Sequence, residues 1–359
     1  MVLRAGLIGY GKRGEVLARI IREYVPEIDI VGVVDPDIER IAAAHNVGFR
    51  GWTVSKHFFV ADRPDVAIIA TNPPQHCELV VMAAEHGCHI FCEKPLALSP
   101  DEADRMVAVV EKAGVVSVVD FEMPFADSVQ LLRTYLAAEQ FGALYRLEMT
   151  GKGRPPAYDL EEVMVHYLHL MLWLTGSKPV DVFGRIILNG KNATMGDVAA
   201  MSDIYPQSRK WGIGIRADSI EASYRLANGV VAQLFLHEFV EMDHDYMTLS
   251  CYGTRGRLTF FQSGTGELYV AEGPLEKSDT ALAWERAPRL WASDSDWSIP
   301  TARLLREFVS AIQSGRASTA SIADASLVLD MTLGVYASHL AGKPVALPLV
   351  DRRHPLVAR

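Results

Sequence analysis

The stretch that decides the fold is Leu3-Arg4-Ala5-Gly6-Leu7-Ile8-Gly9-Tyr10-Gly11-Lys12-Arg13-Gly14. An apolar run, a Gly-x-Gly-x-x-Gly turn and an amphipathic stretch in this order predict a strand, a tight loop and a helix. Gly9 permits the turn, Gly11 lets the backbone approach a pyrophosphate, and Gly14 allows the helix to pack closely on the strand. The loop, Gly9, Tyr10, Gly11, Lys12, Arg13 and Gly14, is therefore a candidate dinucleotide site, with the helix N-terminus facing the phosphates. On the alternative interpretation, the glycines only make the turn.

The pattern then repeats over the first third of the chain. Strands are predicted at 3–8, 28–35, 66–71, 89–92 and 115–119, and helices at 11–24, 37–45, 75–86 and 100–113. Short apolar runs that alternate with amphipathic helices predict a doubly wound parallel sheet, the Rossmann arrangement. Ser99 and Glu102 predict a capping box on the last helix. The alternation stops near Asp120, so the expected nucleotide-binding domain covers residues 1–120.

The rest of the chain has mixed character. A helix is predicted at 160–175, strands at 180–188, 219–226, 230–236, 247–252, 257–261 and 267–270, and closing helices at 301–314 and 322–340. Ala227-Asn228-Gly229 predicts a hairpin turn, because Asn-Gly accepts positive φ angles. Gly190 to Gln207 has the weakest pattern and is expected to be a loop. Residues 121–359 are therefore predicted to form an α+β domain around a large, mostly antiparallel open sheet, whose final helices are able to pack back on the first domain.

Length and charge narrow the class of protein. A chain of 359 residues exceeds one hydrophobic core, so two domains are expected. A net charge of −9 provides no basic field for nucleic acid or anionic membranes, which we do not expect as partners. The absence of a leader pattern and of a long apolar run predicts a cytoplasmic protein. Its four cysteines suggest no secreted framework, so the thiols are expected to be reduced.

One cluster imitates a metal site. His76, Cys77, His86, Cys88, His89 and Cys92 lie close in sequence. They are distributed over a helix, a turn and a strand, where alternation directs neighbouring side chains to opposite faces. We therefore expect no metal.

Three strand ends supply further candidates. Asp35, at the end of the second strand, would accept hydrogen bonds from ribose hydroxyls and repel a 2′-phosphate, which favours NAD over NADP. Arg40 and Lys12 lie near enough to weaken that preference. The expected cofactor-binding set is completed by Thr71, Asn72, Pro73, His76, Glu93 and Lys94.

These motifs together resemble the glucose-fructose oxidoreductase, inositol dehydrogenase and rhizopine-catabolism (Gfo/Idh/MocA) family. The resemblance covers nearly the whole chain and rests on the glycine loop, Ala70 to Pro73 with His76, Glu93-Lys94-Pro95, His166 to Gly176, and Ser338 to Pro348. It is specific for the family and weak for the substrate. It implies an NAD-dependent dehydrogenase acting on CH–OH groups of a polyol or sugar, with a second domain for substrate binding and for assembly into a homodimer or homotetramer.

The resemblance also implies catalytic residues. Lys94 would bind the reacting hydroxyl and stabilise its negative charge, while Glu162 and His166 on the second-domain helix complete the site. Residues four apart share a helix face, and an imidazole with a pKa of ~6.5 suits a general base. Glu162 would orient His166 or bind a neighbouring hydroxyl. Taken singly, the three residues equally fit a solvated lysine, an exposed acid and a core histidine.

The chain departs from the family pattern where the substrate would bind. Glu162 replaces a common aspartate, His169 stands where the family has aspartate or asparagine, and Pro124 occupies the place of a frequent arginine. Glu122 adds an acid, so Glu122 and His169 are candidate substrate residues. Asp120 and Glu122 equally fit ordinary loop positions. The departures predict a substrate unlike that of the best-known inositol enzymes.

Three functions remain open from the sequence. The first is a dehydrogenase of a secondary hydroxyl in a sugar, glycoside or cyclitol. The second is a glycoside-cleaving lyase or hydrolase that retains NAD and oxidises the hydroxyl transiently, which would yield cleavage without net reduced cofactor. The third is a sugar- or nucleotide-sensing regulator without turnover, against which the presence of Lys94 and His166 argues.

Overall fold

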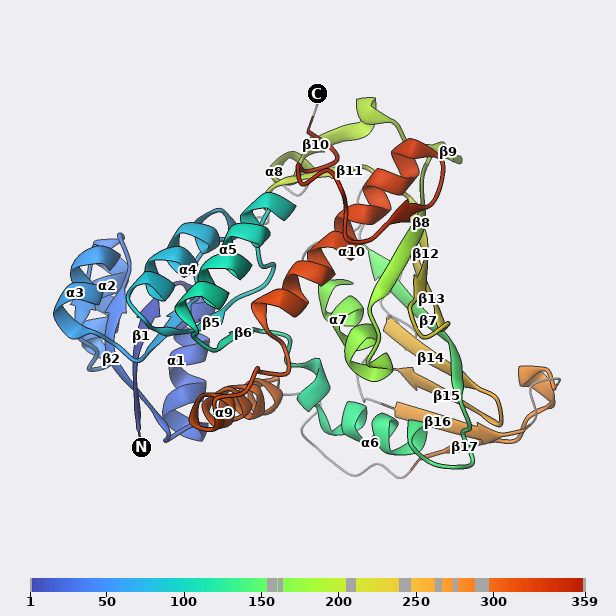
Figure 1. Ribbon diagram of the computed structural model, residues 1–359, viewed down its shortest axis with the longest axis horizontal. Coiled ribbons are helices and arrows are strands. Elements are labelled where there is room, and N and C mark those ends of the chain that lie inside the picture. Colours follow the sequence, from blue (N-terminus) through green and yellow to red (C-terminus); the bar gives the residue numbers. More distant parts are fainter. Residues whose placement is uncertain are drawn as a thin grey trace. The chain divides into compact units, whose positions relative to one another are not determined.

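The computed structural model describes two compact units. Its described residues are 2–153, 160, 164–204, 211–238, 247–261, 267–273, 277–287 and 297–357. The first unit comprises Met1–Glu122 with Ser298–Leu329, and the second Met123–Trp297 with Asp330–Arg359 (Figure 1). The domain limits predicted from the sequence, 1–120 and 121–359, stay a prediction.

The first unit contains a six-stranded parallel sheet of order β3-β2-β1-β4-β5-β6. Its strands are β1 (Leu3–Ile8), β2 (Ile28–Val34), β3 (Gly51–Trp52), β4 (Val66–Ile69), β5 (His89–Cys92) and β6 (Ser117–Val119). Its helices are α1 (Lys12–Tyr24), α2 (Ile38–Asn46), α3 (Ser55–Asp62), the 3-10 turn η1 (Pro73–Gln75), α4 (His76–Glu85), α5 (Pro100–Ala113) and α9 (Ser298–Ser314). The strand order reverses between β1 and β4, which is where ligands bind in open α/β sheets.

Helices cover both faces of this sheet (Figure 1). Helix α1 packs against α9, and α4 packs against α5. All four residues of β4 are fully buried, as expected of a parallel strand between two helical layers. The predicted doubly wound sheet is confirmed, with β3 and α3 as elements that the sequence pattern did not reveal.

The predicted capping box at α5 is wrong. Ser99 occupies the N-cap position, but its side chain makes no capping hydrogen bond. The Glu102 carboxylate instead accepts the backbone N–H of Leu98 at 3.0 Å. The acid therefore stabilises the loop that enters the helix rather than the N-cap amide.

The second unit contains a large open sheet of order β17-β16-β15-β14-β7-β13-β12-β8-β18, with β9 paired to β8. The strands are β7 (Leu144–Gly153), β8 (Pro179–Leu188), β9 (Lys191–Asn192), β12 (Ser219–Leu226), β13 (Val231–Glu238), β14 (Met247–Gly253), β15 (Gly256–Phe261), β16 (Glu267–Glu272), β17 (Trp284–Arg286) and β18 (Val345–Ala346). Among the described strands of this sheet, only the β13–β7 pair is parallel. The predicted, mostly antiparallel sheet is confirmed.

Helices complete this unit. They are α6 (Asp127–Leu136), α7 (Met164–Thr175), α8 (Met201–Ile204), α10 (Ile322–Ala341), which begins in the first unit, and the 3-10 turns η2 (Met123–Phe125), η3 (Met195–Asp197) and η4 (Asp279–Ala281). Burial alternates along β12, where Ile220, Ala222 and Tyr224 are buried and the residues between them are not. One face of the sheet thus packs on a core, and the other remains partly exposed.

The predicted hairpin is confirmed, with a different turn conformation. Strand β12 pairs with β13 in antiparallel register, and the Leu226 amide donates to the Val230 carbonyl at 2.9 Å. Of the two turn residues, Gly229 has a positive φ of 87°, whereas Asn228 does not. The Asn228 side chain accepts the Val230 amide at 3.2 Å, so it closes the turn by a hydrogen bond.

The segment Gly190 to Gln207, expected to be a loop, contains regular elements in its described part. As far as Ile204 this segment contains β9, η3, β10 (Val198–Ala200) and α8, and β10 pairs with β11 (Ile213–Ile215); residues 205–207 lie outside the described part. Thr194 and Asp197 form a capping box, and Met201 packs with Ile204 and Ala199 in a small core. Such short elements leave little periodicity in the sequence.

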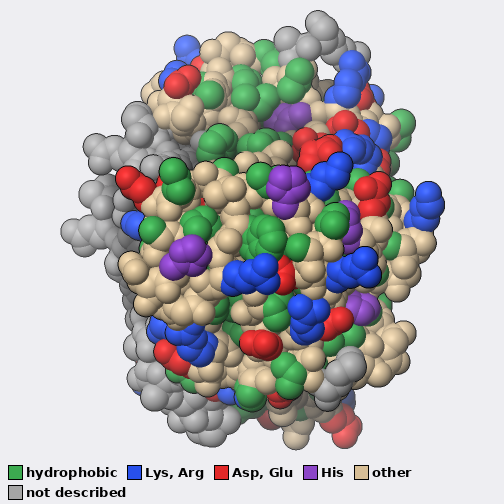
Figure 2. Space-filling model, turned by 90° about the vertical axis from the view of Figure 1, so that its left-hand side faces the viewer, with side chains coloured by type: hydrophobic (Ala, Val, Ile, Leu, Met, Phe, Trp, Pro, Cys, Tyr) green, Lys and Arg blue, Asp and Glu red, His purple; other side chains and the backbone are tan. Residues whose placement is uncertain are grey.

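Figure 2 shows Lys and Arg side chains interspersed with Asp and Glu on one face of the molecule. No helix in the described ranges combines the length and the apolar character that crossing a bilayer requires.

Candidate functional site

The glycine loop has the shape that its sequence predicts. Gly9 has a φ of +94°, and a Cβ there would lie 2.6 Å from the Ala70 carbonyl oxygen. A Cβ at Gly14 would lie 2.1 Å from the carbonyl oxygen of Gly9. The turn and the close approach of α1 to the loop therefore require these two glycines.

Gly11 differs from its neighbours. The atom nearest to a Cβ at Gly11 would be Arg40 Nη1, at 3.6 Å. The protein itself thus leaves room beside this residue, which is the N-cap of α1. An open backbone position at a helix N-terminus fits a phosphate.

Asp35 follows β2 and anchors the glycine loop through a hydrogen bond. It is 2% exposed, and its Oδ2 accepts the Tyr10 amide at 2.8 Å and Arg40 Nη1 at 3.2 Å. Its Oδ1 accepts the Asp37 amide at 2.9 Å. Two backbone donors and a guanidinium compensate the buried charge, so an ionised carboxylate is held at the end of the strand.

His76 is placed inside the unit. It is fully buried, and its Nδ1 lies 3.0 Å from the Pro95 carbonyl oxygen while its Nε2 lies 3.1 Å from that of Thr71. Burial lowers the pKa of His76, which keeps the ring neutral. The ring thus joins the loop after β4 to the loop after β5. The predicted contact of His76 with a cofactor stays a prediction.

Arg13 and Glu93 bind one another. Arg13 Nε donates to Glu93 Oε1 at 2.5 Å, and Arg13 Nη2 donates to Asp120 Oδ2. The sequence predicts that both residues contact a cofactor, and it fits Asp120 equally to an ordinary loop position. In the structure the guanidinium ties the glycine loop to the ends of β5 and β6. A buried acid directly after a buried strand was the signal that could have singled out Asp120.

Asp120 is an unusual acid. Its side chain is 1% exposed, and burial, reinforced by repulsion from Glu93 and opposed by Arg13, raises the pKa of Asp120 to about 8. Burial, followed by repulsion from Asp120, also raises the pKa of Glu122, which is partly exposed. Lys94, the next residue after Glu93, is partly exposed and donates its backbone N–H to Glu93 Oε2 at 3.3 Å.

These residues fit a bound dinucleotide. Gly11 presents open backbone at the start of α1, and Asp35 offers a carboxylate at the end of the adjacent strand. Thr71 Oγ1 is buried and has no hydrogen-bond partner among the described residues. The donor set lies at the carboxyl edge around the strand-order reversal, where the fold binds its ligands.

The expected residues of the second unit lie on or near α7. His169 is 2% exposed in a helix whose neighbours Leu168 and Leu170 are also buried, and His166 is partly exposed. Glu162 lies outside the described residues. Lys94 belongs to the first unit and the two histidines to the second, so their joint action remains a prediction.

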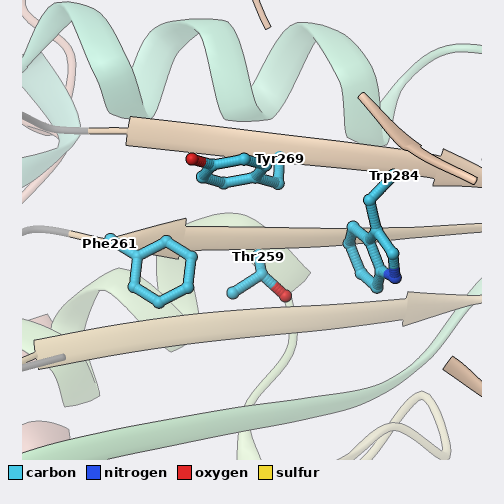
Figure 3. Close-up of a pocket in the computed structure, with 4 residues that line it drawn as sticks. All are labelled: Thr259, Phe261, Tyr269 and Trp284. Atoms are coloured by element: carbon cyan, nitrogen blue, oxygen red, sulfur yellow. The ribbon is translucent and has the colours of Figure 1, made fainter. Parts of the chain in front are cut away.

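A hollow on the sheet of the second unit was not anticipated. Thr259, Phe261, Tyr269 and Trp284, from β15, β16 and β17, line a space of about 310 Å³ (Figure 3). Its lining consists of three aromatic side chains and one threonine, and Thr259 and Tyr269 each carry a hydroxyl. We assign it no chemistry.

Members of the histidine and cysteine cluster make hydrogen bonds within the first unit. His89 Nδ1 accepts the Val116 amide at 2.9 Å, and Cys88 Sγ donates to the Pro64 carbonyl at 3.1 Å. Within the described ranges, no three His, Cys, Asp or Glu side chains are grouped to hold a metal ion. All four cysteines are buried and unbridged.

Comparisons with known proteins agree with this geometry. The family described as "Oxidoreductase family, NAD-binding Rossmann fold" (GFO_IDH_MocA) matches residues 3–121. The chain is 31% identical to D-glucoside 3-dehydrogenase of Escherichia coli over 40% of its length, and 28% identical to scyllo-inositol 2-dehydrogenase (NAD(+)) of Bacillus subtilis over 55%. These matches span 41% and 61% of the two relatives.

A solved structure shares the fold over nearly the whole chain. Levoglucosan dehydrogenase in complex with NADH and levoglucosan superposes with a TM-score of 0.77 at 21% identity, over 97% of this chain and 100% of that one. The family match, the relatives and the shared fold agree with the motifs. Residues 3–121 match the Gfo/Idh/MocA family of oxidoreductases and form an NAD-binding Rossmann fold, and the chain as a whole shares the fold of levoglucosan dehydrogenase.

Proposed function

We propose that the protein is an NAD-dependent dehydrogenase that oxidises a secondary hydroxyl of a sugar, glycoside or cyclitol. The observation that carries the proposal is the glycine loop held by the buried Asp35, with Lys94 two strands away at the same edge of the sheet. The relatives support the substrate class, because they are named for action on a glucoside and an inositol. When bound, NAD would accept hydride from the carbon that bears the hydroxyl.

The residues of the chain have separate tasks in this proposal. The Lys94 ammonium binds the hydroxyl oxygen and stabilises the negative charge that develops on it. His166 removes the hydroxyl proton, and Glu162 orients His166 or binds a neighbouring hydroxyl. Glu122 and His169 contribute to the choice of substrate. Thr71, Asn72 and Pro73 hold the cofactor together with the glycine loop, in which Lys12 is exposed.

Turnover tests the proposal. Purified protein with NAD and a panel of sugars, glycosides and cyclitols should produce reduced nicotinamide, measured by its absorbance. Lys94→Ala should lower kcat by about 10²–10³-fold, as loss of one oxyanion donor does in other enzymes. Exposed Lys112→Ala is the matched control. The proposal would be contradicted if folded wild-type protein produced no reduced nicotinamide and did not differ from Lys94→Ala in this assay. Glycoside cleavage without net reduced cofactor would replace it with the NAD-retaining lyase.

Cofactor choice is a second test. We infer that NAD is preferred over NADP, because a buried, ionised Asp35 repels a 2′-phosphate. Fluorescence titration should show NADH bound at least ~10-fold more tightly than NADPH, which corresponds to ~1.4 kcal/mol. Arg40→Ala should widen that ratio, since its guanidinium neutralises Asp35 and lies beside Gly11. NADPH binding as tight as NADH binding would contradict the preference.

We also propose a homodimer or homotetramer assembled through the sheet of the second unit. The partly exposed face of that sheet supports this proposal, since Phe183 and Val231 are more than one third exposed there. Light scattering coupled to gel filtration measures the mass directly. A monomer of 39.6 kDa at micromolar concentration would be the contrary result.

A further inference from the structure

Two acids face one another at the carboxyl edge of the parallel sheet. Glu93 follows β5 and Asp120 follows the adjacent β6. The backbone fixes both, because the Glu93 amide donates to the Ile69 carbonyl and the Asp120 amide to that of Cys92, each at 2.9 Å. The side chains are 8% and 1% exposed. Two carboxyl groups are thus confined together with little access to water.

A single guanidinium serves both acids. Arg13 binds Glu93 through Nε and Asp120 through Nη2. One positive charge balances one carboxylate, so two ionised acids would leave a net negative charge in a buried site. A buried site of this kind favours the neutral form of one acid.

Hydrogen bonding also favours the neutral form of one acid. Besides burial and repulsion from Glu93, a hydrogen bond between the two acid side chains raises the pKa of Asp120. Two ionised carboxylates cannot form that bond, since both are acceptors only, whereas a protonated carboxyl group donates. Asp120 Oδ1 is also buried without a donor among the described residues. One proton between the two acids satisfies the contact.

We propose that Glu93 and Asp120 share one proton at neutral pH, that Arg13 clamps the resulting monoanion, and that this pair positions the loop that carries Lys94. The link to that loop is Glu93 Oε2, which accepts the backbone N–H of Lys94 at 3.3 Å. The positioning role rests on the proposed function. The shared proton does not, because it concerns the cofactor-free protein.

The charges around the pair are mixed. Arg13 approaches from α1 and Lys94 from the loop after β5, while Glu122 and the Cys92 thiol lie on the same strand ends. Burial and repulsion from Glu93 outweigh the attraction of Arg13, so the pKa of Asp120 is raised to about 8. Asp120 therefore retains its proton at pH 7.

Infrared difference spectroscopy of the cofactor-free protein tests the shared proton. Asp120→Asn and Glu93→Gln each keep the shape of the site and leave Arg13 one carboxylate. Wild type should show protonated-carboxyl absorption at pH 7 that disappears with a midpoint near pH 8, and both variants should lose the part of it that Asp120 contributes. Burial and repulsion from Asp120 also raise the pKa of Glu122 to about 8, so Glu122→Gln identifies the remaining part and should keep the Asp120 band. Glu78→Gln, in an exposed ion pair with Arg105 at 3.0 Å, should keep the band. A wild-type spectrum at pH 7 equal to those of both variants would overturn the proposal.

The double variant Glu93→Gln/Asp120→Asn tests the clamp. It leaves the guanidinium without a carboxylate, so the loss of thermal stability should exceed the sum of the two single losses. Failure of the double variant to fold while both singles fold is the extreme form of the same result. Additive losses would overturn the clamp.

Turnover tests the positioning role. The single variants should keep kcat within about tenfold of the wild-type value. They should also lose the change in kcat that wild type is expected to show near pH 8. The double variant should lose about 10²-fold in kcat, the cost of a reacting group displaced by about 1 Å. Equal kcat values and unchanged pH profiles in all variants would overturn this role. If wild type shows no turnover, the proposed function fails, while the infrared and unfolding results still decide the shared proton.

Discussion

At the scale of the residue, Asp120 makes stability depend on pH. The pKa of Asp120 rises from 3.8 to about 8 on folding, so the folded state binds more protons between these values. The stability it contributes is complete below about pH 4 and is lost as the pH rises through 8. From pH 5 to pH 9, the free energy of unfolding of Asp120→Asn should therefore rise relative to wild type by at least ~1.4 kcal/mol, one unit of pKa.

Urea unfolding at several pH values measures this difference. Asp104→Asn, an exposed acid on α5, is the control and should follow wild type. Parallel stability curves for wild type and Asp120→Asn would show that Asp120 titrates as it does in the unfolded chain.

Gly14 packs directly against the backbone of the glycine loop. Its Cβ position lies 2.1 Å from the Gly9 carbonyl oxygen, which is backbone and cannot rotate away. Gly14→Ala should therefore lower the free energy of unfolding by at least ~2 kcal/mol and weaken NADH binding. Gly11→Ala, where the nearest atom is at 3.6 Å, should keep its stability yet also weaken NADH binding. Calorimetry with fluorescence titration separates the two effects, and an equally stable Gly14→Ala would contradict the packing argument.

At the scale of the element, Gly184 lets α10 approach the sheet. A Cβ on this β8 residue would lie 2.6 Å from the Val335 carbonyl oxygen. Gly184→Ala should cost about 1–3 kcal/mol, because helix and strand must separate. Gly196→Ala, an exposed glycine in η3, is the control and should change stability by less than ~0.5 kcal/mol. Chemical denaturation measures both, and equal losses would show that the helix–strand contact yields.

The regular elements could be predicted from their sequence. Strand β5 and helix α5 have the expected bounds, because a buried apolar run and an amphipathic stretch are local signals. Strand β3 and helix α3 could not be predicted in this way. A strand of two residues is too short to show a periodic pattern, and Lys56-His57-Phe58-Phe59 in α3 does not alternate polar and apolar residues with the period of a helix.

Part of the candidate site could likewise be predicted from local sequence, and part could not. The glycine loop and Asp35 follow from residue spacing within one βαβ unit. The pairing of Arg13 with Asp120 joins residues 107 positions apart and depends on which strands are neighbours. No local pattern carries that information. His76 was found by its motif, and its buried position became visible only with the loop around Pro95.

At the scale of the whole molecule, the thiols report opening of the structure. All four cysteines are buried and unbridged, and burial raises the pKa of Cys88 to about 12. A thiol reagent attacks the thiolate, so native protein at neutral pH should react at most very slowly. All four thiols should react at once in guanidinium chloride. Rapid labelling of one thiol in native protein would reveal a local opening, and mass spectrometry of the labelled peptide would locate it.

The parallel-sheet unit also has a consequence for biosynthesis. Helix α9, which packs on α1, and the first turns of α10 belong to this unit. The 175 residues Met123–Trp297 separate them from its first segment, which ends at Glu122. On the ribosome, the residues up to Glu122 emerge long before α9 is translated. During that interval the apolar surface that α9 later covers, including Phe91 near Phe308, has no native partner. The nascent chain therefore offers a binding site for chaperones until the last fifth of its synthesis.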